Sequence, residues 1–257
     1  MQHVDAFADI PLAVKGLTVA YNQKLAVFSI DFTAPKEKMI AIVGPNGAGK
    51  STFLKAALGI VPKLSGSVFT FGERLQSAHR DIAYVPQRNS VDWDFPARVV
   101  DVVMMGLYSK AGLFRFFNSK HKKTALECLE RVGMADFANR QIGQLSGGQQ
   151  QRVFLARSLA QNAKLYLLDE PFAGVDAATE RTIVSVLKSL KNDNRTVICV
   201  HHDLATLTQY FDHVLFINVR KIADGPVKTT CDAENLNATY GGQLATTHIH
   251  ELNIQAG

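Results

Sequence analysis

The chain has 257 residues, 47% of them hydrophobic and 20% charged, which is enough to bury a substantial core and argues against a disordered protein. No apolar run reaches the roughly 18 residues that a membrane-spanning helix needs. The net charge of +5 comes from scattered lysines and arginines, without the aromatic and basic interleaving typical of single-strand nucleic-acid binders. The N-terminus lacks a signal-peptide pattern, so we expect a cytoplasmic protein with buried or free thiols at its three cysteines.

The N-terminal third is expected to form strands around one glycine-rich loop. Residues 12–20 and 26–34 alternate like half-buried strands, with a turn at Tyr21–Lys24. Residues 39–43 form a short apolar strand that runs into the loop at Gly44–Ser51, and a helix follows to about Leu58. Further strands are expected at 66–71 and 82–85.

In the remaining two thirds of the chain, the sequence pattern first predicts helices and then strands and helices in alternation. Helical apolar spacing predicts helices over 97–107, 124–132 and 149–160, with a solvated helix start at Lys120–Lys123. Strands are expected at 165–168, 196–200 and 214–217, and a helix over 177–190 separates the first two. This βαβ alternation predicts a mainly parallel sheet covered by helices, interrupted by a helical insert.

The glycine-rich loop matches the pattern G-x-x-x-x-G-K-[ST] in full. Its glycines let consecutive N–H groups point at phosphate oxygens, and the next helix presents its positive end to the same anion. Lys50 adds a full charge for the β- and γ-phosphates, and the Ser51 hydroxyl is a Mg²⁺ ligand. The residues expected to bind the nucleotide here are Gly44, Pro45, Asn46, Gly47, Ala48, Gly49, Lys50, Ser51 and Thr52.

Two carboxylates end the apolar strand at 165–168. Carboxylates at the C-terminal edge of a parallel sheet lie where ligands bind. We expect Asp169 to hold Mg²⁺ and Glu170 to act as the general base that polarises the attacking water.

A second anion cradle opens the helix over 149–160. Ser146-Gly147-Gly148 offers exposed N–H groups, a hydroxyl and a helix dipole. One nucleotide does not need two cradles in one chain, whereas two chains facing head to tail do. The run Leu145–Gln149, followed by Gln150–Val153, resembles the signature motif of the ATP-binding cassette (ABC) family.

The resemblance implies roles for further residues. Tyr21 resembles the aromatic residue that stacks on adenine, and Gln87 resembles the glutamine that senses Mg²⁺ and the γ-phosphate. Gly174-Val175-Asp176 resembles the loop that crosses to the partner chain in this family. His202 resembles the switch histidine because Asp203-Leu204 follows it, with His201 as the alternative. The implied sites are catalytic residues Lys50, Gln87, Glu170 and His202, metal ligands Ser51, Gln87 and Asp169, and a cradle for the partner's ATP at Ser146, Gly147, Gly148 and Gln149.

The implied fold is an α/β P-loop NTPase (RecA-like) core with a mainly parallel sheet, an N-terminal antiparallel β region and a helical insert. We expect the core at residues 10–86 and 163–235, the helical signature subdomain at 87–162, and a polar tail at 236–257. The implied cofactors are ATP and Mg²⁺.

A single cassette without membrane helices or long coiled coils resembles the ATPase subunit of an importer whose permease is a separate polypeptide. The run Arg88–Pro96 carries the sole tryptophan, Trp93, and Phe95 on a charged loop. Together with residues 104–108, 112–114 and 143–157, it resembles the manganese/zinc/iron importer branch. Residues 88–100 are expected to dock the permease, although ordinary packing of both aromatics is the alternative. The expected assembly is a homodimer at the cytoplasmic face of the membrane, with permease subunits, an extracytoplasmic solute-binding protein and no nucleic acid.

The expected cargo is a divalent transition metal, with manganese first and zinc, iron or an iron chelate as alternatives. A soluble, non-transport ABC ATPase acting on nucleic acid or the ribosome is the alternative of a different class. His248 and His250 form a His-x-His pair in the tail, for which an incidental polar tail is the favoured interpretation over metal binding.

Overall fold

The computed structural model describes residues 9–74, 80–108 and 118–241, and the chain forms two compact units. Among the described residues, the first unit holds 9–74 and 198–241, and the second holds 80–108 and 118–197. The expected functional division into residues 10–86 with 163–235, 87–162 and 236–257 stays a prediction. The two units are described one at a time below.

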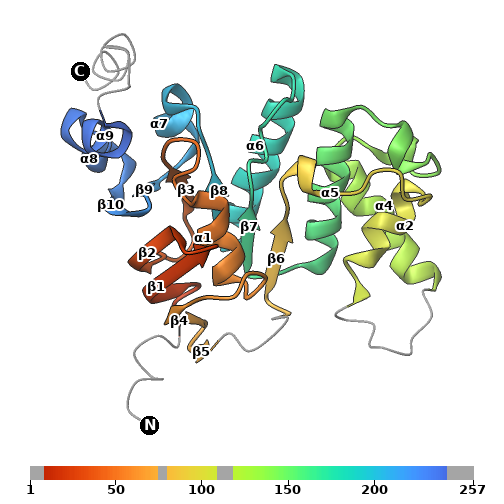
Figure 1. Ribbon diagram of the computed structural model, residues 1–257. Helices are drawn as coiled ribbons and strands as arrows, with labels where there is room; N and C mark the ends of the chain where they lie inside the picture. Colours follow the sequence, from red (N-terminus) through yellow and green to blue (C-terminus); the bar gives the residue numbers. More distant parts are fainter. Residues whose placement is uncertain (1–8, 75–79, 109–117, 242–257) are drawn as a thin grey trace. The chain divides into compact units, whose positions relative to one another are not determined.

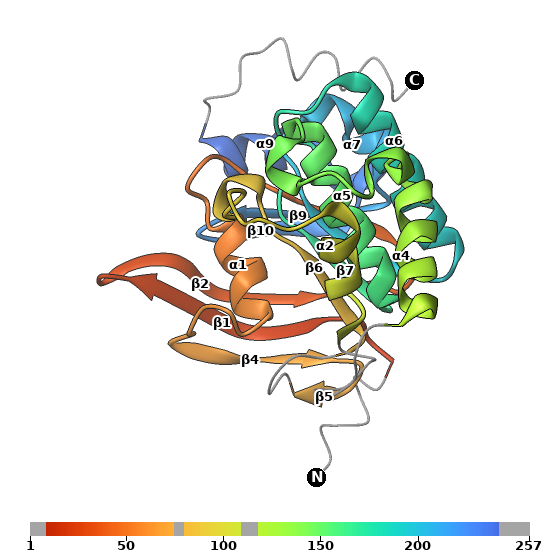
Figure 2. The same cartoon turned by 90° about the vertical axis from the view of Figure 1, so that its right-hand side faces the viewer.

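An antiparallel sheet forms the N-terminal part of the first unit (Figure 2). Its strands, in spatial order, are β2 (Lys24–Thr33), β1 (Ala13–Tyr21), β4 (Ser65–Thr70) and β5 (Glu73–Arg74). Asn22 and Gln23 connect β1 to β2 with φ of 45° and 68°, the left-handed pair that a tight two-residue hairpin requires. The predicted antiparallel β region is confirmed, although the two-residue strand β5 was not predicted.

A buried parallel pair follows in the same unit. β3 (Met39–Val43), all five residues buried, runs parallel to β9 (His213–Asn218), with Ile40 opposite His213 and Val43 opposite Phe216. β10 (Arg220–Pro226) pairs antiparallel with β9 and was not predicted, because its largely exposed, polar sequence carries no apolar alternation.

Short helices complete the first unit. They are α1 (Lys50–Ala57), the 3₁₀ turn η5 (Leu204–Thr206), α7 (Leu207–Tyr210), α8 (Val227–Thr230) and α9 (Ala233–Tyr240). α1 follows directly on the loop after β3 and packs against β1 and β2, with Phe53 edge-on to Phe32 of β2 at 6.2 Å between ring centroids. The fully buried Phe53 therefore fixes the helix whose first turn ends the phosphate loop.

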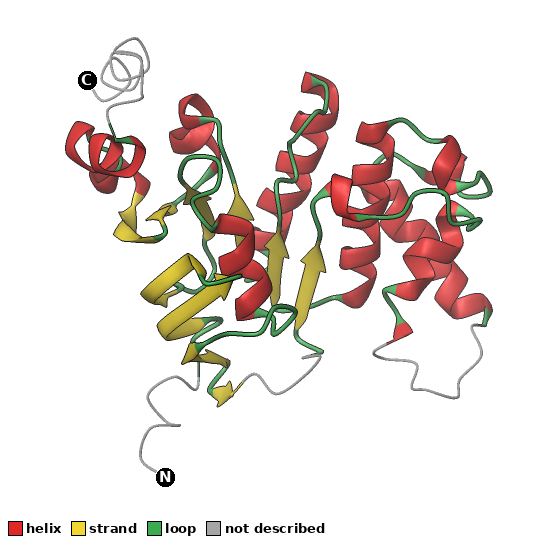
Figure 3. Ribbon diagram, viewed as in Figure 1, coloured by secondary structure: helices red, strands yellow, loops and turns green. Residues whose placement is uncertain are grey.

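Three mutually packed helices characterise the second unit (Figures 1 and 3): α2 (Val99–Met105), α4 (Ser119–Arg131) and α5 (Gly147–Gln161). The 3₁₀ turns η2 (Arg88–Ser90), η3 (Ala135–Phe137) and η4 (Ile142–Gln144) connect this part of the chain. α4 begins at Ser119, one residue before the solvated helix start predicted at Lys120–Lys123, because the Asn118 side chain caps it by accepting from the backbone N–H of Lys120 and His121.

Two parallel strands lie in the same unit as these helices. β6 (Ile82–Val85) pairs with β7 (Leu165–Leu168), with Ile82 opposite Leu165 and Val85 opposite Leu168. α6 (Ala177–Asn192) follows, and β8 (Thr196–Val200) runs across the boundary between the two units. The predicted mainly parallel α/β architecture is confirmed.

The state of the cysteines and the length of the helices agree with what the sequence predicted. Cys128 and Cys199 are buried, Cys231 is half-buried, and all three are free thiols, as predicted. Over the described ranges, no helix combines the length and apolarity needed to cross a bilayer.

Candidate functional site

The phosphate loop, Gly44–Ser51, leaves the buried strand β3 through a position that only glycine fits. A Cβ on Gly44 would collide with the backbone carbonyl of Ile217, and a Cβ on Gly49 would collide with that of Ala26. Gly49 also has φ of 91°, in the region that side chains strongly disfavour. The glycines of the motif are therefore dictated by close backbone approach as well as by the turn.

Lys50 lies inside the phosphate loop. Its side chain is 94% buried, and its ammonium group donates to the carbonyl oxygens of Gly44 and Pro45 at 2.9 Å each. No side chain caps the N-terminus of α1, because the capping position is Gly49. The N–H groups of the first turn and the Lys50 charge thus point to an anion site at this helix end.

The acidic site of the second unit lies where β7 ends. Asp169 is fully buried, and Glu170 accepts a hydrogen bond of 2.7 Å from the side-chain amide of Gln87. Glu170 adopts a φ of 55°, a strained conformation for a residue with a side chain. Because β6 and β7 are parallel neighbours, the residues that follow their ends meet, which brings predicted residues Gln87 and Glu170 together.

Tyr84 on β6 was not predicted as part of this site. Burial and, secondly, the Asp169 carboxylate raise the pKa of its hydroxyl above its usual range, so the phenol stays neutral beside the aspartate. Its alternating position on a short apolar strand resembles any core tyrosine, so the sequence carried no signal of its contact with Asp169.

The signature segment, Leu145–Gln149, forms the start of α5. The Ser146 hydroxyl accepts from the Gln149 N–H at 3.4 Å, and the Gln149 side chain accepts from the Ser146 N–H at 2.9 Å. This reciprocal capping box holds the helix start while Ser146 stays exposed. The predicted second cradle therefore has the expected helix-terminal geometry.

The start of α6 lies against the start of α5. Asp176 caps α6 by accepting from the backbone N–H and the hydroxyl of Thr179, at 2.8 and 3.1 Å. These hydrogen bonds lower the pKa of Asp176, so its carboxylate is charged near neutral pH. A Cβ on Gly148 would approach the Thr179 side chain at 3.1 Å, so Gly148 lets the two helix starts pack closely.

Two adjacent histidines at the end of β8 have different environments. His201 is 98% buried, with Nε2 at 2.8 Å from the Thr206 hydroxyl and its ring 5.1 Å from that of Phe211. Burial lowers its pKa from 6.5 to about 4, so it is neutral near pH 7. His202 is exposed. These environments favour His202 as the residue that meets a nucleotide, and its assignment stays a prediction.

Tyr21, the predicted adenine-stacking residue, ends β1 with 49% of its surface exposed. A side chain in the core could not stack on a base, so this exposure is compatible with the predicted role.

The loop after Gln87 separates its two aromatic residues. Trp93 is half-buried, packs edge-on against Phe154 of α5 at 4.9 Å between ring centroids, and donates from its indole N–H to the Arg88 carbonyl. Phe95 is 56% exposed. Trp93 therefore packs within the unit, the alternative interpretation for that residue, whereas Phe95 is available to a partner.

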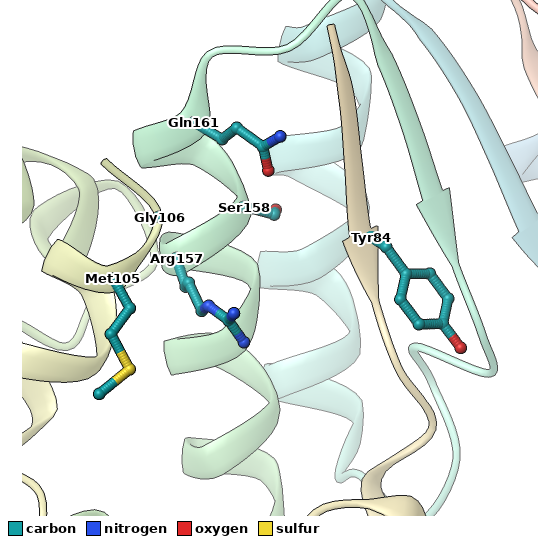
Figure 4. Close-up of a pocket in the computed structure, with 6 residues that line it drawn as sticks. All are labelled: Tyr84, Met105, Gly106, Arg157, Ser158 and Gln161. Carbon is teal, nitrogen blue, oxygen red and sulfur yellow. The ribbon is translucent and has the colours of Figure 1, made fainter. Parts of the chain in front are cut away.

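A cavity of about 120 Å³ lies in the second unit (Figure 4). Arg157, Ser158 and Gln161 of α5 line it together with Met105 and Gly106 at the end of α2 and with Tyr84 of β6, whose ring points away from α5. Burial lowers the pKa of Arg157, whose guanidinium lies 5.6 Å from the centre of the Phe154 ring. The segment from Gly112 to Phe114, the histidines His248 and His250, and most of the polar tail lie outside the described residues.

The chain is similar to known proteins over most of its length. Residues 27–173, more than half of the chain, match the family model described as ABC transporter. The manganese transport system ATP-binding protein MntB of Bacillus subtilis is 52% identical over 234 residues, which cover 91% of this chain and 94% of the relative. The zinc transport system ATP-binding protein TroB of Treponema pallidum is also 52% identical, over 91% of this chain and 88% of the relative.

A solved structure adds the state of assembly of a relative. The ATP-binding cassette MJ0796, a dimer in a post-hydrolysis state bound to ADP and Pi, is 26% identical with a TM-score of 0.74, covering 84% of this chain and 98% of that chain. The complete phosphate loop, the acidic strand end and the signature helix start agree with these matches. The chain therefore belongs to the ABC transporter family, as an ATP-binding cassette whose ATP hydrolysis drives transport.

Proposed function

We propose that this chain powers the uptake of a divalent transition metal ion, with manganese as the cargo. The observation that carries the proposal is the 52% identity to a manganese transport ATP-binding protein over 91% of the chain. Zinc is the second candidate, because a zinc transport ATP-binding protein is equally identical. No group of three His, Cys, Asp or Glu side chains gathers within the described ranges, so this chain itself offers no selective metal site there.

The phosphate loop binds ATP in this proposal. The loop fits the phosphates because its glycines allow close backbone approach and because the first turn of α1 has no side-chain cap. Lys50 neutralises charge on the β- and γ-phosphates, Thr52 adds an N–H donor, and Tyr21 stacks on the adenine.

The acidic site supplies the water activation. Asp169, Ser51 and Gln87 would hold Mg²⁺ in this proposal, because carboxylate, hydroxyl and amide oxygens are the ligands that this ion prefers. When bound, Mg²⁺ would withdraw charge from the phosphate oxygens. Glu170, oriented by the Gln87 amide, takes the proton of the attacking water, and His202 hydrogen-bonds the γ-phosphate.

Two chains complete each site. Ser146, Gly147, Gly148 and Gln149 of one chain close on the ATP held by the phosphate loop of the other. The fixed, exposed start of α5 supports this role, because its N–H groups and its dipole favour an anion from outside the chain. Closing the pair after ATP binding and opening it after hydrolysis would drive the permease between its access states.

The membrane partners bind the second unit in this proposal. Permease subunits dock near Arg88–Val100, with the exposed Phe95 as an anchor, and hold the cassette pair at the cytoplasmic face of the membrane. An extracytoplasmic solute-binding protein delivers the ion to the permease.

The test is metal accumulation in the native cell. The gene for this chain is deleted, and radioactive manganese, zinc and iron are offered separately to cells restored with wild type, Glu170→Gln or Phe95→Ala. Wild type should restore manganese uptake, and Glu170→Gln should not. Phe95→Ala should lower uptake while the purified variant binds ATP normally. Unchanged accumulation of all three metals after deletion would contradict the proposed cargo and leave the ATPase assignment intact.

A further inference from the structure

Arg88, directly after Gln87, contacts the start of the signature helix α5. Its Nε donates to the side-chain oxygen of Gln150 at 3.1 Å, and Gln150 is 97% buried. The amide of Gln150 in turn donates to the Ile142 carbonyl, in the turn that precedes the signature segment. Gln150 therefore links Arg88 to the residues before and after the signature segment.

The guanidinium lies against the first residue of the helix. A Cβ on Gly147 would come within 2.9 Å of the Arg88 Cζ and 3.0 Å of its Nε, so only glycine leaves the guanidinium in this place. This gives Gly147 a second role besides exposing its N–H group.

The backbone of the same loop is fastened to α5 and to the hydrolysis site. The Trp93 indole donates to the Arg88 carbonyl at 2.9 Å while its ring packs on Phe154 of α5. On the other side of Arg88, Gln87 donates to Glu170 at 2.7 Å. Arg88 therefore stands between the glutamine that orients the catalytic carboxylate and the helix start that forms the second cradle.

Electrostatics indicates what this placement achieves. A cation at the positive end of a helix is unfavourable by itself, because the helix dipole and the cation repel each other. The same cation becomes favourable when an anion occupies that helix end, where both attract it. The acceptor on Gln150 holds the guanidinium in this place until the anion arrives.

We propose that Arg88 is a positioning residue that fixes the signature helix start and adds its charge to the cradle for the partner chain's ATP phosphates. The inference rests on the proposed composite site. Arg88 acts on the nucleotide bound by the other chain, whereas its neighbour Gln87 acts on the nucleotide bound by its own.

Mixed dimers of full-length chains with two affinity tags separate these effects, because Lys50→Ala leaves one working phosphate loop per dimer. In the control dimer, Lys50→Ala is paired with wild type. In the first test dimer, the Lys50→Ala chain also carries Arg88→Ala, so the working loop meets an altered signature start. In the second, Arg88→Ala is in the chain with the working loop.

The first test dimer loses one charge-assisted hydrogen bond, between the Arg88 guanidinium and the phosphates of the partner's ATP. It should therefore hydrolyse ATP about tenfold more slowly at low ATP concentration, with a raised KM. The second should stay within about twofold of the control, since it keeps an intact facing cradle. Arg88→Lys should recover part of the loss because it keeps the charge. Arg140→Ala in place of Arg88→Ala is the charge-matched control, since Arg140 is an exposed arginine of the same unit that stacks on Phe137.

Equal losses in both test dimers, or a loss only in the second, would overturn the inference and leave the composite site standing. Full activity of a dimer whose Lys50→Ala chain also carries Ser146→Arg would overturn the composite site and the inference with it. Thermal unfolding of each variant checks folding, and a Tm shift with unchanged KM in the first test dimer would reduce Arg88 to a structural contact.

Discussion

Replacing His201 with glutamine should weaken the dependence of stability on acid, because His201 resists protonation only in the folded chain. Burial lowers its pKa from 6.5 to about 4, with His202 contributing in the same direction and Asp203 opposing it. As the pH falls below 6.5, the His201 imidazole is protonated in the unfolded chain but stays neutral in the folded chain. Stability present above pH 6.5 is therefore lost on acidification, and the loss is complete below about pH 4.

The size of the effect follows from the two pKa values. The difference between 6.5 and about 4 corresponds to about 3 kcal/mol once both states are protonated. Between about pH 7.5 and about pH 5, the loss attributable to His201 is about 2 kcal/mol. Glutamine can keep a polar contact with the Thr206 hydroxyl and does not titrate, so this part of the loss should vanish.

Urea unfolding at these two pH values measures the effect for wild type, His201→Gln and His202→Gln. His201→Gln should lose about 2 kcal/mol less on acidification than wild type, and His202→Gln is the substitution of the neighbouring exposed histidine. In ATPase assays the order should reverse, with His202→Gln reducing turnover about 100-fold or more. Equal acid sensitivity of wild type and His201→Gln would refute the buried, neutral assignment of His201.

Three further predictions address the nucleotide site. Glu170→Gln should slow turnover at least about 100-fold while ATP binding persists and a dimer accumulates in sedimentation with ATP; near-normal turnover would rule out Glu170 as the base. Gly49→Ala should weaken ATP binding and cost about 1–3 kcal/mol of stability from the collision with the Ala26 carbonyl and the strained φ. Gly16→Ala, with φ of 58° but open space around its Cβ, should leave ATP binding unchanged, and equal effects on binding would contradict the close-approach argument. Ser146→Arg chains mixed with Lys50→Ala chains should recover the activity of one site, whereas neither homodimer should turn over; absence of recovery would exclude a composite site.

The predictable part of the fold is the part with strong local patterns. The runs at β3, β6, β7 and β8 match the predicted strands residue for residue, because almost all of their residues are apolar and buried. β10 was missed because its pairing with β9 depends on a neighbouring strand and not on its own residues. The start of α4 at Ser119 depends on the Asn118 cap, and the polar run Lys120–Lys123 after it was predicted as a solvated helix start.

Motifs predicted the site residues but not the contacts between them. The sequence could place Gln87 and Glu170 in one site only through family resemblance, and the 2.7 Å hydrogen bond between them depends on parallel pairing of β6 with β7. The environment of His201 depends on Thr206 and Phe211, so adjacency in sequence could not distinguish it from His202 by burial. Arg88 and Gln150 belong to no spacing pattern, and their contact needs the folded start of α5.

Uptake by a reconstituted complex tests the central claim most directly. The chain is copurified with its permease and placed in lipid vesicles, with ATP on the side of the membrane that the cassettes face. Radioactive manganese is added on the other side, and the manganese that reaches the ATP side is counted with and without ATP. Manganese should move into the ATP compartment only when ATP is present and should not move with Glu170→Gln. Zinc should compete with manganese more strongly than calcium or magnesium does. Transport that persists without ATP, or ATP-driven transport of an organic solute with no movement of any transition metal, would contradict it.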